Sequence, residues 1–93
     1  MTKRVVVTGM GALTPIGNNL NSFWGNLISG KSGADKITKF DTTNFKTKFA
    51  CELKDFQLPD HFDRKELKSY DPFTLYSLVA VEEAVQHANV NID

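Results

Sequence analysis

Two stretches of the chain carry apolar side chains at helical spacing. In the first, apolar residues fall at i, i+3, i+4, i+7 and i+8, which is the pattern of one buried helix face. These residues are Leu20, Phe23, Trp24, Leu27 and Ile28. Asn18–Asn19 supplies an N-terminal cap, and Gly30 supplies a C-terminal stop. Gly25 inside this helix costs about 1 kcal/mol relative to alanine, so close packing is expected there.

The second helix is predicted to begin at Asp71–Pro72 and to end near Asn89. Aspartate is a good N-cap residue, and proline suits the first helical position because the N–H group it lacks has no partner there. The first half of this helix is apolar on all sides, whereas the second half is amphipathic. We therefore expect the first half to be buried in a larger body and the second half to reach solvent.

Two other segments are predicted to be strands. Arg4–Thr8 contains the consecutive valines Val5–Val7, so both of its faces are expected to be buried, as in the centre of a parallel sheet. Lys48–Lys54 alternates between apolar and polar residues, which predicts a half-buried strand near a sheet edge. Its apolar side consists of Phe49, Cys51 and Leu53.

The segments between these elements are predicted to be turns, an ordered loop and a short charged helix. In chain order they are a flexible turn at Gly9–Ala12, a second break at Thr14–Gly17, a loop over Lys31–Thr47, a turn at Leu58–Asp60 and a helix over Asp63–Lys68. Within the loop, Phe40 and Phe45 are isolated aromatic residues that are expected to anchor it.

The predicted strand over Arg4–Thr8 demands more structure than this chain supplies. A central strand needs neighbours on both edges and cover on both faces. A chain of 93 residues also buries only about 60–68% of its unfolded surface. We therefore interpret residues 1–93 as the beginning of a larger α/β domain without an internal boundary. The alternative is a compact α+β domain with an exposed sheet edge.

Composition and charge exclude several classes of function. Hydrophobic residues make up 41% and charged residues 24% of the chain, which is ordinary for a globular domain. Basic and acidic residues number 11 each, so no global charge attracts nucleic acid or an anionic membrane. No apolar run approaches the roughly 18 residues of a membrane span, and the N-terminal residues do not form a signal peptide. The cytoplasm is therefore the expected location.

Two glycine patterns match nucleotide-binding motifs, but neither has the required context. Gly9–Gly11 follows a predicted strand, yet Thr14 stands where the dinucleotide-binding fingerprint needs its third glycine. Gly25–Ser32 fits the phosphate-binding loop pattern letter by letter. That loop must precede a helix, whereas residues up to Ile28 lie within one and Gly30 ends it. Both patterns are therefore interpreted as structural, and no cofactor is expected.

Cysteine, histidine and acidic residues form no recognisable catalytic or metal site. Cys51 is the single cysteine, and its place on the apolar side of a strand predicts a buried, inert thiol. His61 lies near a turn and His87 on the polar side of the last helix, without a cysteine or histidine partner at metal-ligand spacing. Glu82 and Glu83 are most simply interpreted as a solvated helix face. No metal site is expected.

The short charged helix carries a local basic cluster. It consists of Arg64, Lys65 and Lys68, with Glu66 beside them. Such a cluster is either the solvated face of a surface helix or a docking patch for an acidic partner. The chemistry of these residues fits both interpretations, so the choice between them depends on what the rest of the chain indicates.

A series of motifs, in order along the whole chain, resembles the β-ketoacyl-acyl-carrier-protein synthases. They are Val5–Asn18, Trp24, Leu27, Gly30–Gly33, Phe40–Thr42, Lys48–Ala50, Lys54–Phe56, Arg64–Glu66 and Asp71–Phe73 with the apolar helix behind it. Lys48–Ala50 and Lys54–Phe56 are most similar to the synthase II branch, the elongating enzymes of bacterial type II fatty-acid synthesis. The resemblance implies a thiolase-like fold of two related α/β halves in an αβαβα layered arrangement. Residues 1–93 would begin the N-terminal half.

The family resemblance also implies a reaction, a decarboxylative Claisen condensation of an acyl thioester with malonyl-carrier protein. A cysteine on a strand-to-helix elbow takes the acyl group, and two histidines assist decarboxylation and stabilise the oxyanion. By this resemblance all three lie beyond residue 93, and Cys51, His61 and His87 match none of them. The chain alone is therefore expected to be inactive, and no catalytic residue is assigned to it.

The partners that the resemblance implies are the acyl carrier protein, acyl- or malonyl-loaded, and a second copy in a homodimer of the full-length enzyme. In relatives the short helix contributes basic residues to the surface that meets the acidic carrier. Lys65 and Lys68 stand at matching positions with Arg64 adjacent, whereas Ser69 replaces a residue that is commonly basic. Two alternatives stay open: a related ketosynthase of polyketide or initiating type, and a non-enzymatic small α/β interaction domain.

Overall fold

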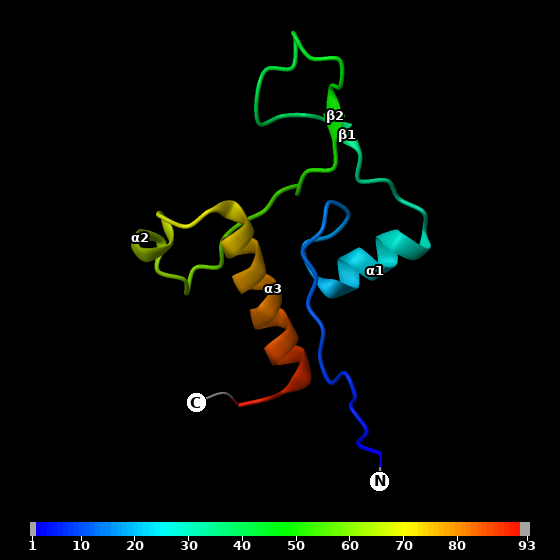
Figure 1. Ribbon diagram of the computed structural model, residues 1–93, viewed down its shortest axis with the longest axis vertical. Coiled ribbons are helices and arrows are strands. Elements are labelled where there is room, and N and C mark those ends of the chain that lie inside the picture. The colour runs from blue at the N-terminus through cyan, green and yellow to red at the C-terminus, as the bar shows by residue number, and fades with distance from the viewer. Residues whose placement is uncertain (1, 92–93) are drawn as a thin grey trace. The chain divides into compact units, whose positions relative to one another are not determined.

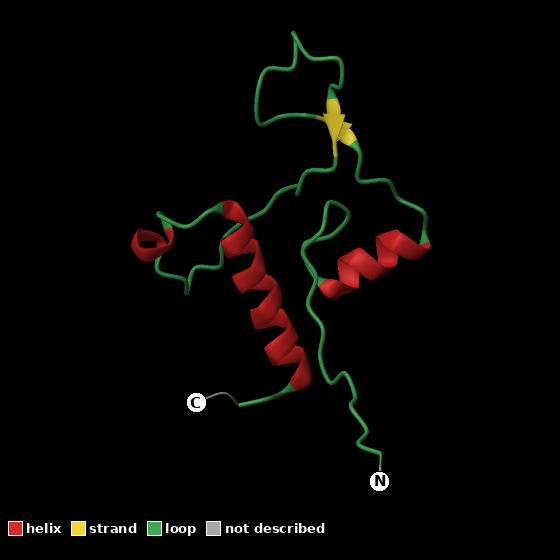
Figure 2. Cartoon of the chain, viewed as in Figure 1, coloured by secondary structure: helices red, strands yellow, loops and turns green. Residues whose placement is uncertain are grey.

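The computed structural model describes residues 2–91 of the chain. In chain order its elements are α1 (Leu20–Ile28), β1 (Asp35–Lys36), β2 (Phe49–Ala50), α2 (Arg64–Leu67) and α3 (Pro72–Ala88) (Figure 1). Turns and irregular loops connect these elements (Figure 2). The chain divides into two compact units. One consists of Leu13–Phe56, and the other joins the residues up to Ala12 with those from Gln57 onward.

In the Leu13–Phe56 unit, α1 begins and ends as the sequence predicts. The side chain of Asn19 caps the helix, since its Oδ1 accepts a hydrogen bond from the Ser22 N–H group at 2.8 Å. Gly30 follows the last turn with φ at 77°, a left-handed conformation that glycine adopts without strain. The Lys31 N–H group then donates to the Asn26 carbonyl at 3.0 Å, which satisfies a carbonyl that the helix end leaves free.

The apolar face of α1 is exposed, and two expectations about it are wrong. Trp24 is 58% exposed and Ile28 is 68% exposed. Gly25, expected to pack closely, has open space where a Cβ would stand. The periodicity therefore locates the helix correctly, but among the described residues no second layer covers the face that the periodicity defines.

A tight turn precedes α1. Thr14 and Gly17 exchange two backbone hydrogen bonds, of 2.8 and 3.1 Å, across Pro15 and Ile16. This confirms the predicted break. The following Asn18 donates its side-chain amide to the Lys54 carbonyl at 2.8 Å, which ties the start of α1 to the end of the unit.

The predicted strand over Lys48–Lys54 is shorter than expected. Only β2 forms, and it pairs with β1 as an antiparallel ribbon in which Asp35 lies opposite Ala50 and Lys36 opposite Phe49. The apolar side is not buried, because Phe49 is 64% exposed. A two-stranded ribbon has no second layer to cover it, so its apolar side chains have no interior in which to be buried.

Phe40 and Phe45 lie in the loop between β1 and β2. Their rings pack edge to face with centroids 5.6 Å apart, and both residues are more than half exposed. The two rings therefore stabilise the loop by contacting each other rather than by anchoring it in a core.

In the other unit, residues 4–8 do not form the buried strand that Val5–Val7 predict. These valines are 94%, 68% and 79% exposed, and residues 4–8 pair with no strand among residues 2–91. A strand of a parallel sheet exists only through hydrogen bonds to its neighbours, so consecutive β-branched residues cannot form one alone. The prediction fails here because the partner strands are missing from the described range.

Residues 9–12, expected to be a flexible turn, run beside α3 instead (Figure 1). A Cβ on Gly9 would overlap the carbonyl of Ala84, and a Cβ on Gly11 would overlap the carbonyl of Ala80. Glycine in the segment and alanine on the helix therefore let the two backbones touch.

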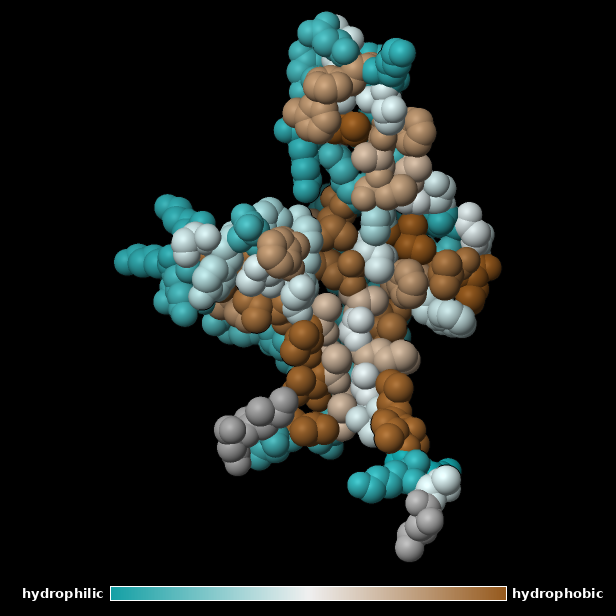
Figure 3. Space-filling model, in the orientation of Figure 1, coloured by the Kyte–Doolittle hydropathy of each residue, from teal (hydrophilic) through white to brown (hydrophobic). Residues whose placement is uncertain are grey.

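α3 has the predicted bounds but not the predicted burial. It begins with Asp71 and Pro72 and ends at Asn89, whose φ of 56° lies in the left-handed region, although the Asp71 side chain makes no cap hydrogen bond. Phe73 is 68% exposed, so the first half is not buried. Hydrophobic surface extends over α3 and the N-terminal segment, whereas hydrophilic side chains gather around α2 (Figure 3). None of the described helices has the length and apolar character needed to cross a bilayer.

Candidate functional site

The basic cluster predicted over residues 64–68 lies on α2, which forms for a local reason. The Asp63 side chain accepts hydrogen bonds from the backbone N–H groups of Lys65 and Glu66, at 3.0 and 3.4 Å. Leu67 is the one buried residue of residues 2–91, with 8% of its surface exposed. Because Leu67 takes the inner side of this short helix, the charged residues around it are directed to solvent. We call Arg64, Lys65 and Lys68 the α2 basic surface.

The three cations of the α2 basic surface are not equivalent. Arg64 Nη2 lies 3.7 Å from the Asp60 carboxylate and donates to the Leu58 carbonyl at 3.3 Å, so its charge is partly compensated by the preceding turn. The side chains of Lys65 and Lys68 are exposed and contact no acidic group in the described part of the chain. The two lysines therefore carry the charge that an acidic partner would meet.

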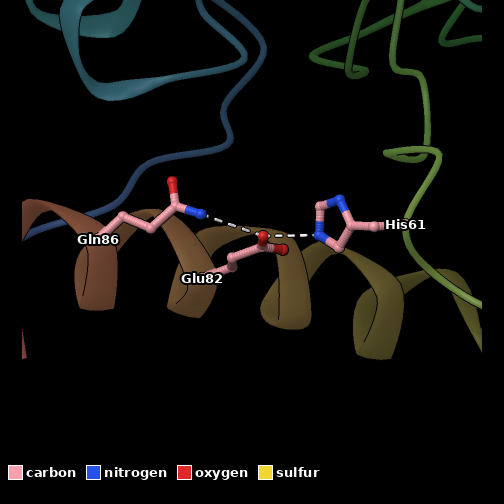
Figure 4. Close-up of polar contacts among 3 residues, drawn as sticks. All are labelled: His61, Glu82 and Gln86. Carbon is pink, nitrogen blue, oxygen red and sulfur yellow. Dashed lines mark hydrogen bonds and ion pairs between the residues drawn. The ribbon is translucent and has the colours of Figure 1, made fainter. Parts of the chain in front are cut away.

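A second cluster joins the turn before α2 to α3. His61 Nε2 lies 2.6 Å from Glu82 Oε1, and the same oxygen accepts a hydrogen bond from Gln86 Nε2 at 3.2 Å (Figure 4). Glu82 is half-buried, so its interpretation as part of a solvated helix face is wrong. The sequence gives no signal for this pair, because the two residues lie on different elements.

Glu83 and His87, one helical turn apart on α3, hold the N-terminal segment. The Met10 N–H group donates to His87 Nδ1 at 3.0 Å, and the Ala12 N–H group donates to Glu83 Oε1 at 2.9 Å. No local sequence pattern signals this role, and the interpretation of Glu83 as part of a solvated helix face is also wrong. Met10 and Ala12 are alternate residues, which is the spacing at which amides of an extended segment point the same way.

Cys51 is a free and exposed cysteine, so the prediction of a buried thiol is wrong. It follows β2, whose ribbon has no covering layer. Within the range 2–91, no three histidine, cysteine or acidic residues come together in a way that could hold a metal ion.

A pocket of about 330 Å³ opens in the Leu13–Phe56 unit, beside β1 and β2. Glu52 lines it and accepts hydrogen bonds from the Thr38 hydroxyl at 2.9 Å and the Thr38 N–H group at 3.2 Å. Desolvation raises the pKa of Glu52, but hydrogen bonds from Thr38 and Lys39 outweigh it and hold the pKa below its ordinary value. Lys54 also lines the pocket and donates its Nζ to the Gly33 carbonyl at 2.7 Å. The charged groups of Glu52 and Lys54 therefore stabilise the surrounding loops through these hydrogen bonds.

A similar local contact lies in the loop between β1 and β2. Asp41 accepts hydrogen bonds from the Thr43 hydroxyl at 2.6 Å and from the Thr43 N–H group at 3.0 Å. Both bonds favour the ionised carboxylate and lower its pKa from the ordinary value. Asp41 is exposed and belongs to a turn, so this shift marks local structure rather than chemistry.

Comparison with known proteins identifies the class to which this arrangement belongs. Residues 2–93 match the family model of the beta-ketoacyl synthase, N-terminal domain. The chain therefore belongs to the beta-ketoacyl synthase family, whose members are acyltransferase-type enzymes.

Individual relatives narrow this class. The chain is 50% identical over 91 residues to the 3-oxoacyl-[acyl-carrier-protein] synthase 2 of Staphylococcus aureus (strain COL), covering 98% of this chain and 22% of that protein. It is 43% identical over 91 residues to the protein of the same name from Synechocystis sp. (strain ATCC 27184 / PCC 6803 / Kazusa), with the same coverage of 98% and 22%. The chain thus spans about a fifth of the length of these relatives.

Comparison of the fold with solved structures also finds a ketosynthase. The ishigamide ketosynthase/chain length factor superposes with a TM-score of 0.80 and 32% sequence identity, over 92% of this chain and 21% of that chain. The described helices and turns are therefore those of a ketosynthase segment. The two-stranded ribbon of β1 and β2 is all of the sheet that residues 2–91 contain.

Proposed function

We propose that this chain is the N-terminal part of an elongating β-ketoacyl-acyl-carrier-protein synthase of the synthase II type. The observation that carries the proposal is the 50% identity to the Staphylococcus aureus 3-oxoacyl-[acyl-carrier-protein] synthase 2 over 98% of the chain. The family resemblance adds a thiolase-like αβαβα fold and a homodimer, and the cytoplasmic location expected from the sequence is part of the same proposal. In this proposal residues 1–93 begin the N-terminal half of that fold.

The reaction proposed for the whole protein is a decarboxylative Claisen condensation. An acyl group moves from its carrier to an enzyme cysteine, malonyl-carrier protein loses carbon dioxide, and the resulting carbanion attacks the acyl thioester to give a 3-ketoacyl-carrier product and a free thiolate. Residues 1–93 would supply none of the three catalytic side chains, since Cys51, His61 and His87 match none of them. Their contribution would be structural support and carrier docking.

An assay of the protein that carries residues 1–93 tests this reaction. Acyl- and malonyl-carrier protein should yield a 3-ketoacyl-carrier product and carbon dioxide, whereas residues 1–93 alone should yield neither product nor stable acylation. Acylation of the short chain at Cys51 would contradict the assignment of the nucleophile to another part of the protein. Absence of condensation by the whole protein would contradict the proposed function.

We further propose that the α2 basic surface docks the acyl carrier protein. One observation supports it: the side chains of Lys65 and Lys68 are exposed and free of acidic partners in the described chain. The family resemblance adds that both lysines match positions that are basic in relatives. Charges at the rim of an interface chiefly raise the association rate, and salt screens their effect.

Charge reversal tests the docking surface. Lys65→Glu with Lys68→Glu should weaken carrier binding more at low salt than at high salt, because salt screens exposed charges. The loss should be small, since each exposed ion pair contributes about 0.2–1 kcal/mol. Turnover of a small carrier-free thioester should not change. Lys3→Glu with Lys46→Glu gives a control of equal net charge at exposed positions outside α2. Equal binding by all variants at low ionic strength would show that the cluster is only a solvated face.

A ketosynthase of polyketide or initiating type is the second candidate. The superposition with the ishigamide ketosynthase/chain length factor at a TM-score of 0.80 favours it, although the identity of 32% is lower than the 50% found for the Staphylococcus aureus relative. An assay that compares carrier protein loaded with straight-chain acyl groups and carrier protein loaded with other acyl groups, at matched concentration, separates the two candidates.

A further inference from the structure

The α2 basic surface lies on a helix that is too short to be stable by itself. α2 contains 4 residues, which is too few for a helix to be stable through its own hydrogen bonds. Its described supports are the Asp63 cap and the burial of Leu67. A further contact, between His61 and Glu82, reaches from the preceding turn to α3 (Figure 4).

The distance between His61 and Glu82 is that of a hydrogen bond between a ring nitrogen and a carboxylate oxygen. The Nε2–Oε1 distance is 2.6 Å, and Nε2 can donate its hydrogen to the carboxylate in a neutral or a protonated ring. Gln86 donates to the same Glu82 oxygen from one turn further along α3, which restrains the carboxylate (Figure 4). The Glu82 side chain is 29% exposed whereas the His61 side chain is 60% exposed, so the contact is shielded from water only in part, through the carboxylate.

The backbone transmits this contact to α2. The Phe62 N–H group donates to the Pro59 carbonyl at 3.2 Å and closes the turn that presents His61. Asp63, which caps α2, follows immediately. A restraint on the His61 side chain therefore fixes the turn, the cap and the direction in which the helix leaves.

We propose that the His61–Glu82 pair is a positioning contact, which holds the turn before α2 against α3 and thereby preorganises the α2 basic surface for the acyl carrier protein. The inference rests on the docking role proposed above. A surface that is already ordered loses less conformational entropy when its partner binds, so the same lysines give a higher affinity. His61 and Glu82 act through Lys65 and Lys68 and do not themselves contact the carrier.

His61→Ala in the protein that carries residues 1–93 is the direct test. The KM for acyl-carrier protein should rise about threefold, the size expected from a partly exposed ion pair, while kcat stays unchanged. Amide hydrogen exchange over residues 64–68 should become faster. A variant that had simply lost structure would show a fall in kcat as well, including for a small carrier-free thioester.

The second histidine of the chain offers a matched control. His87→Ala removes the contact to the Met10 amide in the same unit, so it should change exchange near Met10 but not over residues 64–68. A charge exchange offers a rescue. Glu82→Lys alone should reproduce the effect of His61→Ala, and adding His61→Glu should restore a pair of opposite charges and the original KM.

The results separate this inference from the docking proposal. If the change of Lys65 and Lys68 to glutamate weakens binding but His61→Ala alters neither KM nor exchange, the positioning role is wrong and the docking surface stands. If the lysine changes have no effect, docking on α2 is wrong. In that case faster exchange in His61→Ala, with recovery in the charge exchange, still supports the positioning contact, and unchanged exchange overturns it.

Discussion

Gly9 and Gly11 show how single residues decide the packing of the unit that contains α3. Both face the helix at positions where the backbone of the segment and the backbone of α3 touch, and alanines on α3 leave the necessary space. A larger side chain on either partner would separate the segment from the helix. The hydrogen bonds from Met10 to His87 and from Ala12 to Glu83 depend on the same close approach.

We predict that Gly11→Ala destabilises the whole protein that carries residues 1–93. The new Cβ would overlap the Ala80 carbonyl, and relief of such overpacking costs about 1–3 kcal/mol. Urea denaturation measures the loss. Gly25→Ala is the matched control, because it meets open space inside α1 and should be neutral or stabilising by up to about 1 kcal/mol. Equal stability of Gly11→Ala and the parent would mean that the segment does not lie against α3.

At the scale of elements, α1 is defined by its ends. Its cap, its glycine stop and its apolar period all lie within a few residues of one another in the sequence, and all agree. α2 is shorter, but its start is likewise defined by a local N-cap residue, Asp63. The sequence therefore predicts where these helices begin and end, although it does not predict what covers them.

Asn19→Ala should weaken α1 by about 1 kcal/mol, the usual effect of removing an N-cap side chain. The lost interaction is the 2.8 Å hydrogen bond from the Ser22 N–H group. Chemical denaturation gives the free energy of unfolding, and amide exchange at Ser22 reports on the helix end. Asn21→Ala, an exposed change within the helix, is the control and should not be destabilising. An unchanged exchange rate at Ser22 in Asn19→Ala would contradict the capping role.

At the scale of the whole molecule, apolar surface exceeds what the described chain can cover. Among residues 2–91 only Leu67 is buried, while Val5–Val7, Phe73 and Val81 are all more than half exposed. Isolated apolar side chains on a surface are ordinary, but this many side chains over the N-terminal segment and α3 require a covering layer (Figure 3).

We therefore predict that residues 1–93, prepared alone, associate or remain partly folded. Exposed valines with unpaired backbone groups recruit other chains. Light scattering as a function of concentration measures the association, and hydrogen exchange measures the order of Arg4–Thr8. In a dilute monomer these amides should exchange rapidly. Strong protection there would show that the chain completes its own core and would support the interaction-domain alternative.

The sequence alone determined the helices, the tight turn before α1 and the family. Helix bounds, caps and turns depend on hydrogen bonds between near neighbours, so residues such as Asn19, Gly30 and Asp63 specify them wherever the segment lies. The basic composition of α2 was equally visible, and the ordered motifs led to the family that the comparisons confirm. The false phosphate-loop pattern was resolved in the same way, because Gly25–Ile28 lies inside α1.

Only the tertiary structure decided burial and the contacts between distant residues. The periodicity of an apolar face states which side chains need cover but not whether cover is present, so the predictions for Val5–Val7 and Cys51 failed. The partners of His61, Glu83 and His87 lie on other elements, and nothing in the local pattern marks them. Such contacts form when the folded chain brings two segments together, because their hydrogen bonds depend on position in space rather than on spacing along the sequence.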